Sequence, residues 1–484
     1  MQKLRSDVAQ VASGIFSTIS GGNCNCASAT NSTVSGGRSN CASGTISTVS
    51  GGQANSASAN NSTVSGGYCN ITNARHSTIS GGNRNIIQSP TNECCSRGAT
   101  IGGGVGHNSS GGTFNATSGD LTGTITCCNA GAFSTIGGGL RNCATGFAST
   151  VSGGQSNTAS GSYSTVGGSR ANCASGNYSN VSGGYCNITN ARHSTINGGH
   201  RNIIQSPTNE CCSRGATIGG GVGHNSSGGT FNFTTGDLTG TITCCNAGAF
   251  STIGGGLRNI ATGNCSTVSS GQSNCASGSG STVSGGRNNT ASGFYSTVSG
   301  GAYNTASGTY STVSGGFLNT ASGYLSTVTG GLRAKASKYG EVAHAAGQFA
   351  QKGDAQHSVL VARRNTTDAT VTTLFLDGVD DRLTLPAETT WTFSINLSAY
   401  NDTDNTAAWW IIRGGIRRNA ANGTALIGSL IEERDSEGTM SGTSVAVTAD
   451  DTNEALNINV TGLASKNIRW VAVVDISQVS WGTP

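Results

Sequence analysis

The sequence predicts an all-β protein in which a parallel β-solenoid of about 15-residue coils precedes an antiparallel β-sandwich. First, a valine or isoleucine recurs every fifteen residues, as at Ile19, Val34 and Val49, in the frame Gly-x-x-Ser-Thr-Val-Ser-Gly-Gly-x-x-Asn-x-Ala-Ser. Second, 76 of the 484 residues are glycine, 4 are proline and 10% are charged, a composition that does not suit several ordinary apolar cores. Third, all five tryptophans lie beyond residue 390.

One coil is expected to contain two short strands and two tight turns. Ser-Thr-Val-Ser is typical of a strand, and the glycine pairs and Ala-Ser-Gly supply positions of positive φ. If Val34 points inward, Thr33 and Ser35 point outward, and Ala42 is expected to share the interior with Val34. These two residues contribute about 2–3 kcal/mol per coil, against about 1 kcal/mol of backbone entropy for each ordered residue. We therefore expect stacking, together with association of three chains into a homotrimer, to stabilise the solenoid.

The chain divides into four parts on this pattern. A lead-in of residues 1–13 precedes the repeats at 14–332, a transition at 333–371 follows, and residues 372–484 form the β-sandwich. Two duplicated inserts interrupt the repeats, because residues 65–142 recur as 182–259 with an offset of 117. Inside each copy the apolar spacing stretches to 22 and then 35 residues, which predicts loops or hairpins at about 83–135 and 200–252.

All 17 cysteines lie between Cys24 and Cys275. The inserts contain four vicinal pairs that are candidates for disulfides joining the arms of each excursion, namely Cys94-Cys95, Cys127-Cys128, Cys211-Cys212 and Cys244-Cys245. The alternative is that the cysteines are small buried thiols that occupy the space of a threonine. Because 17 is odd, a monomer or closed trimer retains at least one free thiol.

Composition also argues against several classes of function. The formal charge of +4 and the lack of a Lys/Arg run argue against a nucleic-acid partner. The sequence contains no stretch of about twenty apolar residues, so membrane insertion is not expected. The opening residues lack the apolar core of a secretory signal. No metal or cofactor is expected, because no Cys-x-x-Cys spacing occurs and neither Asp377–Asp381 nor Asp402–Asn405 completes a calcium loop.

Two segments resemble known families. Asn157-Thr-Ala-Ser-Gly-Ser-Tyr-Ser-Thr-Val-Gly-Gly and the copy that begins at Asn304 resemble the YadA-like head repeats of trimeric adhesins, over about residues 14–345. Gly347-Gln-Phe, Leu374-Phe-Leu-Asp-Gly and Ile468-Arg-Trp-Val-Ala are similar, in that order, to the C-terminal region of phage and other viral tail-fibre proteins. The resemblance implies homotrimeric fibres that touch host surfaces, without the membrane anchor and coiled-coil stalk of the adhesins.

No catalytic residue is predicted, and the protein is not expected to be an enzyme. A glycan-cleaving tailspike is an alternative, because each insert contains one Glu and one Asp, Glu93 with Asp120 and Glu210 with Asp237. The histidines, His107 and His224 among them, are expected to be ordinary hydrogen-bonded surface residues. A second alternative is an ice-binding solenoid, since the outward Thr and Ser of each coil would form a ladder of hydroxyl groups.

The function predicted from the sequence is therefore that of a structural fibre, a viral tail fibre or surface filament that attaches to a host glycan or protein. We expect the protein on a virion surface or in an extracellular filament. End-to-end joining of trimers is one way in which such a filament could form. Candidate receptor contacts are Tyr400, Trp409 and Trp410 in the C-terminal domain, and Phe114, Phe231 and Phe233 at the insert tips. Core packing is the alternative role of the tryptophans.

Overall fold

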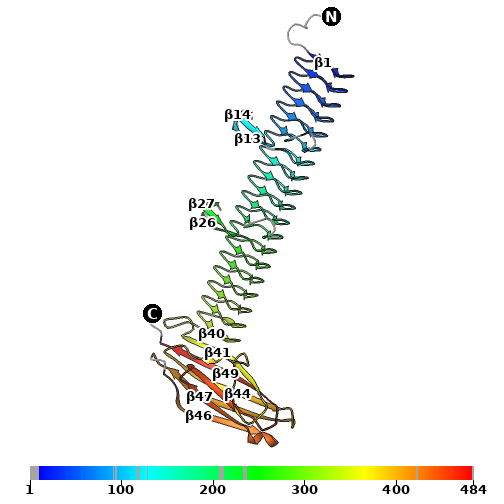
Figure 1. Cartoon of the computed structure of the whole chain (residues 1–484). Helices are drawn as coiled ribbons and strands as arrows, with labels where there is room; N and C mark the ends of the chain where they lie inside the picture. Colours follow the sequence, from blue (N-terminus) through cyan, green and yellow to red (C-terminus); the bar gives the residue numbers. More distant parts are fainter. Residues whose placement is uncertain are drawn as a thin grey trace, which may run out of the picture. The chain divides into compact units, whose positions relative to one another are not determined.

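The computed structural model describes residues 10–481 except 91, 93, 94, 116, 118, 119, 128, 207–211, 233–236, 421 and 422. It confirms the predicted fold class, with a parallel β-solenoid of about 19 coils of about 15 residues followed by antiparallel sheets (Figure 1). The chain forms two compact units, Met1–Thr262 and Gly263–Pro484. No helix among the described residues is long and apolar enough to cross a membrane.

In the first unit each coil contributes one strand to a valine-bearing sheet. Its strands pair in parallel with Thr opposite Thr and Val opposite Val or Ile, as in Thr33↔Thr48 and Val34↔Val49. They are β2 (Thr18–Ile19), β4 (Thr33–Val34), β6 (Thr48–Val49), β8 (Thr63–Val64), β10 (Thr78–Ile79), β12 (Thr100–Ile101), β15 (Thr135–Ile136), β17 (Thr150–Val151), β19 (Thr165–Val166), β21 (Asn180–Val181), β23 (Thr195–Ile196), β25 (Thr217–Ile218) and β28 (Thr252–Ile253).

The second strand of most coils carries alanine, isoleucine or threonine inward, and only the first of these strands exposes both of its residues. These strands are β1 (Val11–Ala12), β3 (Cys26–Ala27), β5 (Cys41–Ala42), β7 (Ser56–Ala57), β9 (Ile71–Thr72), β11 (Ile86–Ile87), β16 (Cys143–Ala144), β18 (Thr158–Ala159), β20 (Cys173–Ala174), β22 (Ile188–Thr189), β24 (Ile203–Ile204) and β29 (Ile260–Ala261). Val34 and Ala42 are fully buried, as predicted. One chain is enough to bury them, so the burial of these side chains does not require a second chain, and the homotrimer stays a prediction.

A buried asparagine completes the interior of each ordinary coil, a role that the sequence pattern alone did not predict. The Asn40 amide group donates to the carbonyls of Gly36 and Gly52, both at 2.9 Å, and its Oδ1 accepts the backbone N–H of Asn55 at 3.0 Å. Asn25, Asn55 and Asn70 repeat this pattern. The side chain thus satisfies backbone groups that the tight turn leaves without a strand partner.

Each duplicated insert contains a two-stranded antiparallel hairpin that leaves the stack of coils (Figure 1). The hairpins are β13 (Ser109–Asn115) with β14 (Asp120–Cys127), and β26 (Ser226–Asn232) with β27 (Asp237–Cys244). The first hairpin stands where the second strand of its coil would lie. There the Asn108 side chain accepts the N–H of Ala144 at 2.9 Å, so the next coil still finds a partner.

The second unit begins with coils of the same kind. Their strands are β30 (Thr267–Val268), β31 (Cys275–Ala276), β32 (Thr282–Val283), β33 (Thr290–Ala291), β34 (Thr297–Val298), β35 (Thr305–Ala306), β36 (Thr312–Val313), β37 (Thr320–Ala321), β38 (Thr327–Gly331), β39 (Lys335–Ala336) and β40 (Val342–Ala345). β40 pairs in parallel with β38 and antiparallel with the first strand of the sandwich. The last coil therefore continues directly into the next sheet.

The C-terminal β-sandwich packs two antiparallel sheets over one apolar core. The larger sheet orders β41 (Ala355–Thr366), β49 (Ile468–Ser480), β44 (Thr389–Asn401), β45 (Thr406–Arg418) and β46 (Thr424–Ser436). The smaller contains β42 (Val371–Thr373), β43 (Leu383–Thr384), β47 (Ser444–Asp450) and β48 (Ala455–Thr461), and a 3-10 helix η1 spans Gly438–Gly442. Trp391, Trp410 and Trp470 from the larger sheet pack with Ile458 and Val460 from the smaller one.

Buried Glu341 joins the last coil to this sandwich. Its carboxylate accepts the N–H groups of Ser337 at 2.7 Å and Lys338 at 3.0 Å, and the hydroxyl of Ser358 in β41 at 2.7 Å. The Lys338 ammonium lies 5.2 Å from the centre of the Trp391 ring. These hydrogen bonds stabilise the carboxylate at a position where an unpaired buried charge would be strongly destabilising.

Candidate functional site

The outer face of the larger sheet carries an aromatic and charged cluster at one end. Alternation along the strands turns Tyr400 of β44, Trp409 of β45 and Arg469 of β49 outward, with Tyr400 opposite Arg469 and Ser398 opposite Trp409. Tyr400 is 47% exposed and Trp409 is 43% exposed. These side chains present large apolar surfaces that the core does not use, which marks the cluster as a candidate binding site.

The cluster lines a shallow groove of about 560 Å³. Tyr400, Trp409 and Val471 form its apolar side, and Arg469, Asp435 and Glu437 supply charge. The Tyr400 hydroxyl donates to the Asn405 side-chain oxygen at 2.6 Å, and the Glu437 carboxylate accepts the Ala407 N–H at 3.2 Å. An aromatic wall beside a guanidinium and two carboxylates suits a ligand with apolar C–H faces and hydroxyl groups, such as a sugar.

Trp410 is not part of this groove, which corrects its prediction as a receptor contact. Its side chain is 1% exposed, and its ring lies 5.7 Å from that of Trp470 in the core. Neighbouring residues on a strand face opposite sides of the sheet, so Trp409 and Trp410 cannot both be outward. Core packing, the alternative role of the tryptophans, is correct for Trp410.

The predicted contacts at the insert tips lie beyond what the structure describes in full. Phe114 belongs to β13 and Phe231 to β26, and their side chains are not described, while Phe233 lies outside the described residues. Glu93 and Glu210 are also outside them, and Asp120 and Asp237 begin β14 and β27 without described side chains. Receptor contact and glycan cleavage at the inserts stay predictions.

The insert cysteines stay predictions in the same way. Cys94, Cys128 and Cys211 are outside the described residues, and Cys127 and Cys244 are the last residues of β14 and β27, without described side chains. Cys95 and Cys212 are exposed and Cys245 is partly buried. The disulfides that were expected to join the arms of the excursions are thus not placed.

The aspartates considered for calcium have structural roles. One Asp377 carboxylate oxygen accepts the N–H groups of Val379, Asp380 and Asp381 at 2.8–3.0 Å, which lowers the pKa of Asp377 although partial burial acts in the opposite direction. Asp404 accepts hydrogen bonds from Lys466 and Thr439, and these lower its pKa. Asp377 therefore stabilises its turn as a carboxylate, and the Asp404 carboxylate links its loop to Lys466 and Thr439 elsewhere in the sandwich.

His107 and His224 are not surface residues, which corrects a second prediction. Both are fully buried, and each takes the place of the asparagine in its coil. His107 donates its backbone N–H to Asn85 at 3.1 Å, and its Nδ1 accepts the N–H of Asn142 at 3.1 Å. Burial lowers the pKa of both rings to about 4, and nearby backbone groups such as the Gly103 carbonyl offset this only in part. The rings are therefore neutral at pH 7.

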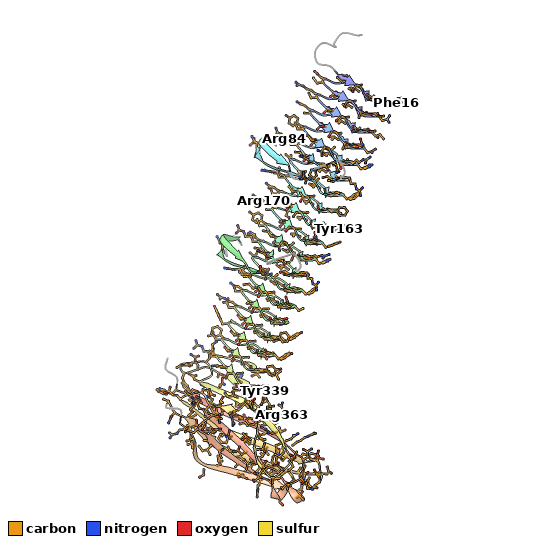
Figure 2. The ribbon with its side chains drawn as sticks, viewed as in Figure 1. Phe16, Arg84, Tyr163, Arg170, Tyr339 and Arg363 are labelled. Atoms are coloured by element: carbon orange, nitrogen blue, oxygen red, sulfur yellow. The ribbon has the colours of Figure 1, made fainter. Side chains whose placement is uncertain are left out.

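A second exposed surface runs along one edge of the coils in the first unit, where Figure 2 labels Phe16 and Tyr163. The Tyr163 and Tyr178 rings are 5.0 Å apart and within 7° of parallel, and His193 stacks on Tyr178 at 4.9 Å. The second unit repeats this between Tyr295 and Tyr310 at 5.8 Å. The sequence signal was available, because these aromatics occupy one position of the fifteen-residue frame. Ring stacking on adjacent coils stabilises their register.

Comparison with known proteins gives one sequence match and a set of solved structures. The model of the ubiquitous surface protein adhesin repeat matches residues 311–323, a part of one coil. This shows an adhesin-type repeat, as the sequence resemblance indicated, although thirteen residues do not define the family of the whole chain. No curated protein matches the sequence.

Three phage tailspikes are among the solved structures that match, all with very low identity. The gp49 tailspike of Acinetobacter baumannii bacteriophage Fri1, a capsular polysaccharide depolymerase, is 8% identical with a TM-score of 0.20, over 92% of this chain and 80% of that one. The Acinetobacter phage vB_ApiP_P1 tailspike is 7% identical with a TM-score of 0.20, over 93% and 82%. That of Acinetobacter baumannii phage AM24 is 8% identical with a TM-score of 0.17, over 87% and 79%.

The expectation that the protein is not an enzyme is corrected by the first of these structures. The Fri1 tailspike is described as a depolymerase, so resemblance to viral fibres does not argue against catalysis. At 8% identity and a TM-score of 0.20, the likeness assigns no catalytic residue to this chain.

Proposed function

We propose that the protein is an attachment fibre whose C-terminal sandwich binds a surface carbohydrate in the groove between Tyr400, Trp409 and Arg469. The observation that carries the proposal is the exposed Trp409 ring beside Arg469, Asp435 and Glu437 in one groove. Sugar rings stack their C–H faces on aromatic side chains and direct their hydroxyls to charged groups. The adhesin-type repeat at 311–323 supports a role at a surface.

Binding is tested with the full chain on immobilised capsular and cell-surface polysaccharides. Trp409→Ala should weaken binding about thirtyfold, the effect of losing one central aromatic contact. Trp481→Ala is the matched control, because Trp481 is an exposed tryptophan outside this groove. Equal binding by wild type and Trp409→Ala would refute the groove as the site. The same incubation, followed by an assay for new reducing ends, measures whether the bound polysaccharide is cleaved.

The homotrimer and a place on a virion surface belong to this proposal. The mass of the native assembly distinguishes a monomer, a closed trimer and an open filament. The groove lies on a sheet face that also exposes Val361 and Val479. A second copy of the chain could therefore cover this face in place of a carbohydrate. If Trp409→Ala changes the native mass while carbohydrate binding is unchanged, the face is a subunit contact and the binding proposal fails.

One observation favours an ice-binding solenoid as a second candidate. The partly exposed threonines of the valine-bearing sheet lie in register, as in Thr33↔Thr48 and Thr48↔Thr63, with exposed serines two residues further on. Strands in a sheet are about 4.8 Å apart, so the hydroxyl groups form a regular flat array. Thermal hysteresis of the full chain is the test, and its absence at high protein concentration removes this candidate.

A further inference from the structure

Two cysteines on neighbouring coils lie opposite each other near the start of the described chain. Cys26 in β3 and Cys41 in β5 are partners in the parallel pairing, and both are partly exposed free thiols. Val11 and Ser56 are the outer neighbours of the pair, so each cysteine has one thiol neighbour in this sheet. Strands about 4.8 Å apart place the Cα atoms within the range of roughly 4.4–6.8 Å that a disulfide spans.

The Cys26 thiol also acts directly on the Cys41 thiol. Burial is the largest cause that raises the pKa of Cys41, and the charge and hydrogen bond of the Cys26 thiol raise it further. The chain offers a natural comparison at the same position of another coil. Cys173 pairs with Thr158 and Ile188, so no thiol lies next to it in the sheet. Cys173 therefore lacks the facing thiol that Cys26 and Cys41 each have.

We propose that Cys26 and Cys41 form a redox modification site at which a small organic disulfide, such as oxidised glutathione, produces an inter-coil disulfide. The Cys26 thiolate attacks one sulfur of the reagent, forms a mixed disulfide and releases one glutathione thiolate. The Cys41 thiolate then displaces the second glutathione. Two protein thiols are oxidised, the reagent is reduced to two thiols, and the protons of Cys26 and Cys41 pass through solvent to the released glutathione.

The position of the pair gives the disulfide a consequence for local stability. β1 (Val11–Ala12) is the first strand that the structure describes, and both its residues are exposed, as are Ile15 and Phe16 in the turn that follows (Figure 2). A coil that buries so little of its apolar surface opens more readily than coils whose valine and alanine are fully buried. A bond from β3 to β5 fastens the early coil to the next one and restricts this opening.

The test oxidises the folded full chain with oxidised glutathione at about pH 8.5, near the ordinary pKa of a thiol. Free thiols are then blocked with N-ethylmaleimide, and a non-reducing digest is analysed by mass spectrometry. The expected product is a peptide pair linked through Cys26 and Cys41, with Cys173 unlinked. The pair should vanish in Cys41→Ser and persist in Cys24→Ser. Serine is tolerated here, because Ser56 occupies the same position in the next coil.

A second measurement keeps the result independent of the variants. Hydrogen exchange at the amides of residues 26–41 should slow by about 10- to 100-fold after oxidation and recover after reduction. Exposed Cys265 reports that the reagent is active, because it should acquire glutathione. If Cys265 is modified while Cys26 and Cys41 are recovered as thiols or as separate glutathione adducts, the proposal is overturned. A linked pair that forms only in denatured protein overturns it as well.

Discussion

The buried histidines predict that the first unit loses stability in mild acid. His107 and His224 occupy the asparagine positions of their coils, and the Nδ1 of each accepts a backbone N–H. Protonation of Nδ1 would place a proton opposite that N–H and a charge inside the coil. Lowering the pH is therefore a perturbation that acts at two defined points of the solenoid.

The magnitude follows from the pKa values. Burial lowers the pKa of each ring from 6.5 to about 4 in the folded state. Above pH 6.5 the rings are neutral in both states, so the full stability is present. Between pH 6.5 and 4 the unfolded chain binds protons that the folded chain does not, and the free energy of unfolding falls with pH. At about 1.4 kcal/mol per pKa unit, the loss approaches about 3 kcal/mol for each histidine near pH 4.

The assay is denaturant unfolding of the full chain, followed by circular dichroism at pH 7.5, 6, 5 and 4. The double variant His107→Asn and His224→Asn restores the residue that the ordinary coils use, so it should fold and lose most of the dependence between pH 6.5 and 4. His193→Asn is the control, because His193 is exposed and should leave the dependence unchanged. An equally steep loss of stability in the double variant and wild type would refute this reasoning.

Three further variants test the packing. Asn55→Ala should cost about 2–4 kcal/mol of unfolding free energy, because it removes the donors to Gly51 and Gly67 and the acceptor for the Asn70 N–H, as a shift of the urea midpoint would show. Gly37→Ala should prevent stable folding, since the φ of Gly37 is 84° and a Cβ there would lie 2.1 Å from the Gly52 carbonyl oxygen. Gly36→Ala is the control, because a Cβ at Gly36 meets no atom within 4 Å and this variant should melt like wild type. Trp410→Ala should destabilise the sandwich by about 3–5 kcal/mol in thermal unfolding, and Trp409→Ala should leave its melting temperature nearly unchanged.

The fold was predictable where local pattern and stacking agree. Val34 and Ala42 repeat in a strand-like context, so their burial follows from alternation alone. Asn40 was missed because asparagine is also a common turn residue, and only the neighbouring coils show that its amide bridges two carbonyls and an N–H. His107 was misinterpreted although its spacing was informative, since it lies 22 residues after Asn85 and 35 before Asn142, the spacing of the apolar positions in the same coils.

The candidate groove was only partly predictable for a different reason. Tyr400 and Trp409 come from different strands, and the sequence alone does not state their register. Strand alternation was enough to show that Trp409 and Trp410 cannot both be exposed, because one of two adjacent residues in a strand faces the core. Arg469 and Glu437 were not foreseen, since charged residues at strand ends are common and only the sheet order brings these two to one groove.

The strand β40 has a mechanical consequence for the attachment role proposed above. It hydrogen-bonds to the solenoid strand β38 on one side and to the sandwich strand β41 on the other. A force that pulls β38 and β41 apart loads the hydrogen bonds on both edges of β40. Several bonds then share the force instead of breaking one after another. When the sandwich is pulled away from the coils, the pairing of β40 should therefore break at high force, without an earlier extension of a flexible linker.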